Sequence, residues 1–93
     1  MSAEVSVRFG SVVRNLRESC SLSQEQLAER ADLNRSYVGE IERGAAMPSL
    51  ATLIKLSIAL DVTASSLLAR YERSGGHLST DTVTPAQAGI QRL

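Results

Sequence analysis

The chain has 93 residues, and its ten basic and ten acidic side chains cancel. Hydrophobic residues make up 43% of the chain and aromatic residues only 3%, which predicts one small domain with an aliphatic core. A single cysteine excludes an internal disulfide, and no apolar run approaches the ~20 residues that cross a bilayer, so we expect a cytoplasmic protein with no membrane span or leader peptide.

The first predicted element is an amphipathic helix over residues 5–19. Its apolar residues recur at spacings of three and four: Val5, Phe9, Val12, Val13, Leu16 and Cys20. Cys20 falls where the pattern requires an apolar side chain, so we assign it to the core. Arg14 and Arg17 lie on or beside the polar face.

Two further helix starts follow, eleven residues apart. Ser23 and Gln26 have the spacing of a capping box, which predicts a helix over residues 23–31. Asn34 is the expected N-cap of the next helix, over residues 34–43. Two short helices joined by a tight turn form a helix-turn-helix, whose second helix can enter a DNA major groove.

The helix over residues 34–43 has an unusual outer face. Val38 and Ile41 point inward, and the opposite face carries Ser36, Gly39, Glu40 and Arg43, with Arg35 projecting from the first turn. A glycine inside a helix costs roughly 1 kcal/mol relative to alanine. Gly39 therefore either lets another surface approach closely or is a tolerated weak point.

Two apolar helices are predicted next, over residues 49–60 and 63–71, capped by Ser49 and Thr63. The first is apolar on most sides, and such a helix is buried or has a second hydrophobic partner. We expect part of both helices to contact a second copy of the chain, through Leu67, Leu68 and Tyr71. The alternative is that all these residues are ordinary core.

The composition changes at Ser74, where a Ser-Gly-Gly sequence precedes a stretch rich in small and polar residues. We therefore predict a domain over residues 1–73 and a flexible or disordered tail over residues 74–93. The tail either has no function of its own or binds a partner.

The segments Leu22–Gly44 and Pro48–Val62 resemble the XRE-type, or lambda-repressor-like, helix-turn-helix DNA-binding family over roughly residues 8–71. LSQEQLAERA resembles the second helix of that family, and SYVGEIERG resembles its recognition helix. The resemblance implies an all-α, five-helix DNA-binding domain. Within the family, NRSYVGEIERG resembles the controller proteins of restriction–modification systems. The turn position, often glycine in the family, is Asp32, which tolerates a left-handed backbone.

The resemblance also assigns roles to individual residues. It implies that Arg17 and Glu42 form an ion pair between the first helix and the recognition helix, because a carboxylate at the inner flank requires a partner. We expect Arg35 to read a guanine, while Arg43 and Gln24 hold phosphates. The full set of expected DNA contacts is Gln24, Arg35, Ser36, Tyr37, Gly39, Glu40 and Arg43.

The sequence therefore predicts a transcriptional regulator that binds a pseudo-palindromic operator as a homodimer, without cofactor or metal. The alternative is an antitoxin or other protein-interaction module whose helix-turn-helix regulates its own operon. An enzyme is not expected, because His77 and Cys20 have no catalytic partner near them in sequence. The neutral net charge predicts modest non-specific affinity for DNA rather than no binding.

Overall fold

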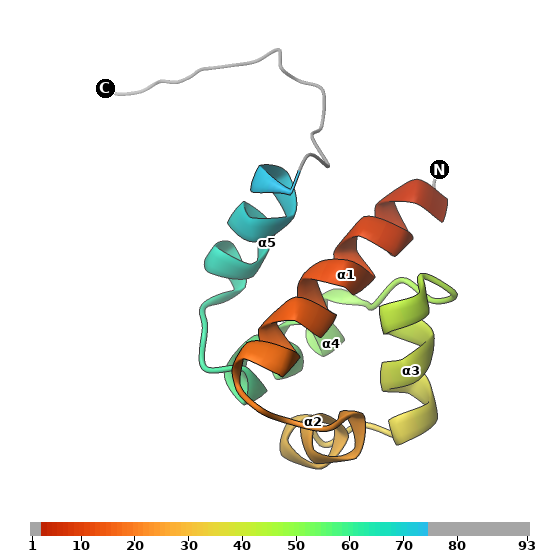
Figure 1. Ribbon diagram of the computed structural model, residues 1–93, viewed down its shortest axis with the longest axis vertical. Helices are drawn as coiled ribbons and strands as arrows, with labels where there is room; N and C mark the ends of the chain where they lie inside the picture. The colour runs from red at the N-terminus through yellow and green to blue at the C-terminus, as the bar shows by residue number, and fades with distance from the viewer. Residues whose placement is uncertain (1–2, 75–93) are drawn as a thin grey trace.

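The computed structural model describes residues 3–74 and contains five helices and no strand in that range. The helices are α1 (Ala3–Ser19), α2 (Gln24–Ala31), α3 (Arg35–Arg43), α4 (Leu50–Ala59) and α5 (Ala64–Arg73), as Figure 1 shows. The predicted all-α fold is confirmed, and each predicted helix boundary lies within about two residues of the observed one. The residues that follow Ser74, where a tail is predicted, lie outside the described part of the chain.

Short-range signals in the sequence set the starts of four helices. The side chains of Ser23, Asn34, Ser49 and Thr63 each accept a hydrogen bond from a backbone N–H in the first turn of the helix that follows. Ser23 and Gln26 complete the predicted capping box. The turn between α2 and α3 passes through Asp32 with a left-handed φ of 57°, and α3 ends at Gly44 with φ 79°.

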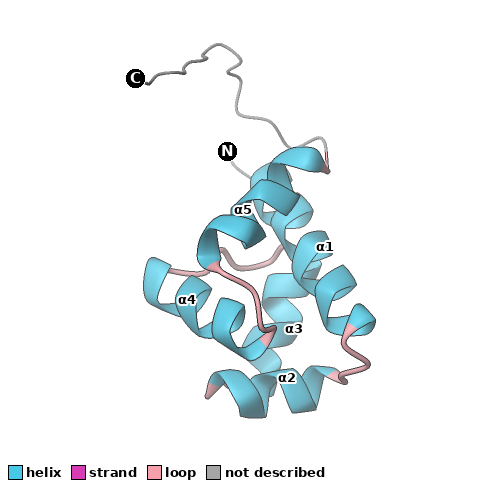
Figure 2. Cartoon of the chain, turned by 90° about the vertical axis from the view of Figure 1, so that its left-hand side faces the viewer, coloured by secondary structure: helices cyan, strands magenta, loops and turns pink. Residues whose placement is uncertain are grey.

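The core lies where α1 packs on α3 and α5, and where α4 packs on α2 and α5. In Figure 2, α2 lies at the lower end of the molecule and α4 lies at its left-hand edge. The core is largely aliphatic, as the composition predicts, with Phe9, Leu27, Leu56 and Leu67 fully buried. This packing holds α2 and α3 as a rigid pair.

The crossing of α1 and α3 depends on a glycine that the sequence analysis did not single out. A Cβ atom on Gly10 would overlap the carbonyl oxygen of Ile41 and lie 2.7 Å from that of Glu42. Because these obstacles are backbone atoms, they cannot move aside as the end of a flexible side chain can. Gly10 therefore allows α1 to approach the last turn of α3.

Two expectations for the first helix are wrong. Cys20 is exposed instead of buried, and Val5 retains 38% of its accessible surface. Helical periodicity gives the direction of a side chain, but burial also requires that the helix continues to that residue and that another element packs there. The helix ends at Ser19, and the chain then turns through Ser21 with φ 59°, so Cys20 no longer follows the pattern.

The helices α4 and α5 also correct part of the sequence analysis. Leu67 and Tyr71 are buried in the core of the protomer, with 0% and 7% of their surface exposed, so they are not free to contact a second copy. Leu68 is 47% exposed. No single helix in residues 3–74 is long and apolar enough to cross a membrane, although α4 and α5, bent by 95°, reach that length and composition together.

Candidate nucleic-acid interface

A shallow polar hollow lies on the outer surface of α3, next to the start of α2. It is lined by one residue of α2 and five of α3: Gln24, Arg35, Ser36, Gly39, Glu40 and Arg43. All six are among the DNA contacts expected from the sequence. Their grouping results from the turn at Asp32, which brings the N-terminus of α2 beside the outer face of α3.

Tyr37, the seventh residue of that set, is placed differently. It is half-buried and packs against the hydrophobic core beside the hollow. Its ring therefore supports the first turn of α3 from behind.

A partly buried polar cluster adjoins the hollow through Gln24. The Arg17 Nε donates a hydrogen bond to Glu42 Oε2 over 2.7 Å, and Arg17 Nη2 donates to Glu42 Oε1 over 3.1 Å. Arg17 Nη1 also donates to the Leu22 carbonyl oxygen over 2.7 Å, in the turn before α2. The two side chains of this ion pair are 11% and 3% exposed. The cluster thus joins α1, the turn before α2, and the last turn of α3.

The charge state of this cluster follows from its contacts. The hydrogen bond from Arg17 to Glu42, aided by the attraction between their charges, raises the pKa of the Arg17 guanidinium above its ordinary value. The guanidinium therefore stays charged over the whole working pH range. The pair implied by the family resemblance is present in this chain, with Glu42 almost fully removed from water.

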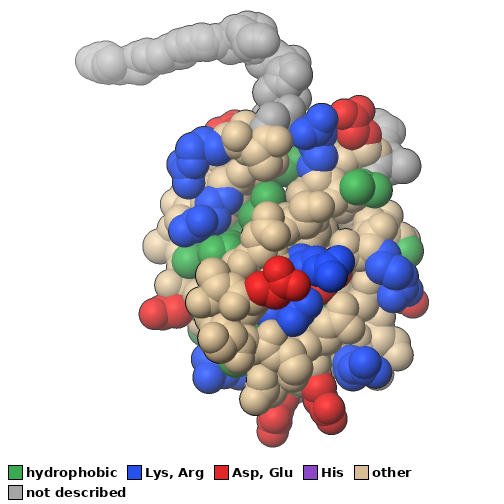
Figure 3. Space-filling view, viewed as in Figure 1, with side chains coloured by type: hydrophobic (Ala, Val, Ile, Leu, Met, Phe, Trp, Pro, Cys, Tyr) green, Lys and Arg blue, Asp and Glu red, His purple; other side chains and the backbone are tan. Residues whose placement is uncertain are grey.

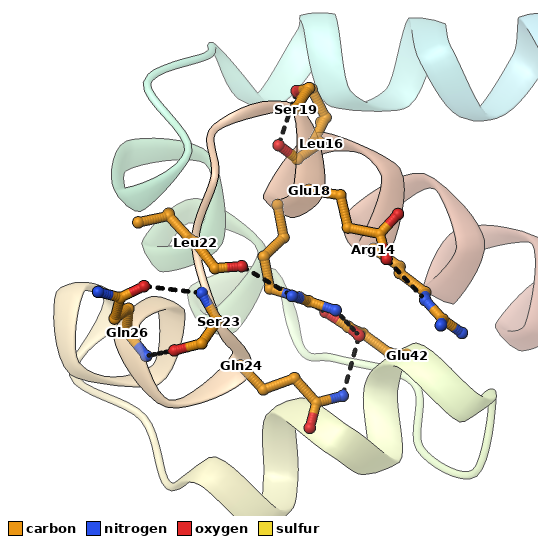
Figure 4. Close-up of polar contacts among 10 residues, drawn as sticks. Arg14, Leu16, Glu18, Ser19, Leu22, Ser23, Gln24, Gln26 and Glu42 are labelled. Carbon is orange, nitrogen blue, oxygen red and sulfur yellow. Dashed lines mark hydrogen bonds and ion pairs between the residues drawn. The ribbon is translucent and has the colours of Figure 1, made fainter.

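Gln24 is the third member of the cluster and connects it to the hollow. Its Nε2 donates a hydrogen bond to Glu42 Oε1 over 3.0 Å, as Figure 4 shows. Because an ionised carboxylate only accepts hydrogen bonds, the amide nitrogen of Gln24 must face Glu42. The Gln24 Oε1 lies on the side of Gly39, 3.8 Å from the point where a Cβ of that residue would stand. One N–H of Gln24 is thus already engaged by Glu42.

The two arginines of the hollow keep their donors available. Neither Arg35 nor Arg43 forms an ion pair with another residue in the described part of the chain. By contrast, Arg14 is paired with Glu18 over 3.3 Å on the exposed side of α1. Basic and acidic side chains are interspersed on the face in Figure 3 and form no extended basic surface. Within residues 3–74 no group of histidine, cysteine or acidic side chains is arranged to hold a metal ion.

Comparison with known proteins identifies a helix-turn-helix protein. The helix-turn-helix family model matches residues 13–67. The control protein C.MunI of Mycoplasma sp is 39% identical over 71 residues, which cover 75% of this chain and 96% of C.MunI. The crystal structure of the restriction-modification controller protein C.AhdI from Aeromonas hydrophila has a TM-score of 0.66 and 46% identity, over 70% of this chain and 97% of C.AhdI. The structure of SinR, a master regulator of biofilm formation, in complex with DNA has a TM-score of 0.62 and 36% identity, over 64% of this chain and 97% of SinR.

The capped helix pair with a polar outer face, held by a five-helix core, is a helix-turn-helix DNA-binding domain. The chain belongs to the XRE-type helix-turn-helix family and is a DNA-binding transcriptional regulator.

Proposed function

We propose that the chain is an operator-binding regulator of the controller type, which binds a pseudo-palindromic site as a homodimer with α3 in the major groove. The polar hollow carries this proposal, because it gathers a hydroxyl, a carboxylate and two arginines that form no ion pair within residues 3–74, all on one face of α3. The likeness to C.MunI and C.AhdI supports regulation of a restriction–modification system. The DNA complex of SinR supports duplex DNA as the ligand.

The proposed roles of the hollow residues follow from their chemistry. Arg35 at the start of α3 presents a forked guanidinium that matches O6 and N7 of a guanine, a contact worth about 1–3 kcal/mol of discrimination. Ser36 bonds to a base edge or a phosphate, and Glu40 accepts from the N4 amino group of a cytosine. Arg43 at the end of α3 and the second N–H of Gln24 bind phosphates.

The proposed dimer uses the apolar surface that α4 leaves uncovered. Leu50, Ile54 and Ile58 repeat every four residues along α4 and are 70%, 43% and 72% exposed. Residues at this spacing form one stripe along a helix. Leu68 adds exposed apolar surface on α5, next along the chain, while Leu67 and Tyr71 support that helix from the core. A row of three aliphatic side chains facing water is typical of a protein interface.

The experiment is selection of bound duplexes from a random DNA library, followed by measurement of variants on the selected site. Arg35→Ala should relax preference at one base pair per half-site, whereas Arg43→Ala should weaken all sequences about equally. The selected site should contain two inverted half-sites whose centres are about 10–10.5 bp apart, one helical turn. A single asymmetric site bound with full affinity by a monomer would contradict the dimeric arrangement.

A further inference from the structure

The glycine in the middle of the proposed recognition helix has no backbone reason to be a glycine. Among the glycines that the structure describes, only Gly44 has a positive φ, so residue 39 has an ordinary helical backbone that any residue adopts. The reason for a glycine at position 39 must therefore lie in what surrounds the place where its side chain would be. Gly39 is nevertheless buried, although it belongs to the outer face of α3.

The atoms that cover Gly39 identify that space. A Cβ on residue 39 would stand 3.1 Å from Arg43 Nη1, which is tighter than ordinary contact, and 3.8 Å from Gln24 Oε1. The Arg43 side chain therefore runs back along α3, one turn toward its N-terminus, and its guanidinium lies across the glycine. This direction is the one that long side chains of a helix adopt.

Nothing else in residues 3–74 holds the guanidinium in this position. Arg43 forms no ion pair there, and its Nη1 and the Gln24 Oε1 lie 3.1 Å and 3.8 Å from the same point, where a Cβ of residue 39 would stand. That amide is itself fixed, because its nitrogen is bonded to the buried Glu42. The surface under Arg43 is thus rigid while the donors of Arg43 remain available to DNA.

We propose that Gly39 is a positioning residue for Arg43: the missing side chain leaves a seat in which the guanidinium lies low against α3, directed at a phosphate beside the groove. Gly39 then acts through Arg43 and makes no DNA contact of its own. This inference rests on the proposed function, since it assumes that Arg43 contacts DNA. It replaces the expectation that Gly39 lets the DNA approach α3 closely.

The test is a double-mutant cycle on the operator obtained by selection, with a labelled duplex of that site as the probe. Gly39→Val fills the seat with a stiff, branched side chain, while Gly39→Ala fills it only in part. We expect Gly39→Val to weaken binding about tenfold and Gly39→Ala by a smaller factor, within the range measured for contacting pairs. In the Arg43→Ala background, Gly39→Val should change affinity less than about twofold, because the residue that it displaces is gone.

Salt dependence gives a second readout that a structural defect would not change. Loss of one phosphate contact lowers the slope of log affinity against log salt by about one. Gly39→Val should lower the slope as Arg43→Ala does, although it alters no charge. Both alanine and valine have higher helix propensity than glycine, so circular dichroism should show full helicity for every variant.

The outcomes separate this inference from the function on which it rests. An equal loss from Gly39→Val with and without Arg43 would overturn the seat and show that residue 39 meets DNA directly. Wild-type affinity for Gly39→Val would also overturn it. Unchanged binding by Arg43→Ala together with loss of preference in Arg35→Ala would refute the seat and leave the proposed docking intact. Unchanged binding by both arginine variants would refute the docking itself.

Discussion

The two halves of this small domain expose surfaces of opposite polarity. The α2–α3 half exposes a polar hollow that adjoins the partly buried Arg17–Glu42–Gln24 cluster. The α4–α5 half exposes a row of aliphatic side chains on the outside of the hydrophobic core. Recognition of a polar ligand requires donors and acceptors at fixed positions, whereas apolar association is non-directional. This difference agrees with the two proposed surfaces, a polar one for DNA and an apolar one for a second copy of the chain.

The largest effect should come from removing the centre of the polar cluster. Glu42→Ala leaves the Arg17 guanidinium buried without a counter-charge and removes the acceptor of Gln24, which should cost about 3–5 kcal/mol of unfolding free energy. Chemical denaturation measures this loss. The matched control is Arg14→Ala, which breaks the exposed pair with Glu18 and should cost less than about 1 kcal/mol. Equal losses would refute the distinction between the two ion pairs.

A smaller but still large effect is expected at the crossing of α1 and α3. Gly10→Ala pushes a methyl group against two carbonyl oxygens of α3 and should destabilise the fold by about 1–3 kcal/mol. Away from this crossing, an alanine in place of glycine stabilises a helix by about 1 kcal/mol. The sign of the change in melting temperature therefore shows whether the clash with α3 or the higher helix propensity of alanine dominates. Ser11→Ala on the exposed side of α1 serves as the control. A stabilised Gly10→Ala variant would mean that the helices cross at a greater distance.

The apolar half should respond in association rather than in folding. Ile54→Glu places a charge in the middle of the exposed stripe of α4 and should weaken self-association at least about tenfold, or about 1.4 kcal/mol. Helicity should be retained, because the residue is 43% exposed in the protomer. Analytical ultracentrifugation measures the dissociation constant, and Ser11→Glu introduces the same charge on α1 as a control. Undiminished association of Ile54→Glu would place the dimer contact elsewhere.

The smallest effect should be the same in both halves, because helix caps are local. Asn34→Ala at the start of α3 and Thr63→Ala at the start of α5 each remove the side-chain acceptor of a backbone N–H, and each should cost about 1 kcal/mol. Denaturation of the two variants under the same conditions checks this equality. A much larger cost at Asn34 would indicate that the polar half depends on its cap for more than helix formation.

The sequence alone determined which segments are helices and where most of them begin. Helix caps act over three or four positions, so Ser23, Asn34, Ser49 and Thr63 could be identified without knowledge of their surroundings. The residues on the outer face of α3 could also be predicted from the sequence, because a helix fixes the relative directions of its own side chains. Six of the seven expected DNA contacts therefore lie together in one hollow.

Tertiary structure decided most of what depends on a second element, and the exception is the Arg17–Glu42 pair, which the family resemblance implied. Only the packing of α5 on α1 and α4 showed that Leu67 and Tyr71 are core, and only the end of α1 at Ser19 brought Cys20 to the surface. Gly10 and Gly39 look alike in the sequence, as single glycines within helices. The first accommodates the backbone of a crossing helix, and the second lies beneath an arginine of its own helix. Periodicity gives the direction of a side chain, but what occupies the space in that direction is decided by the assembled fold.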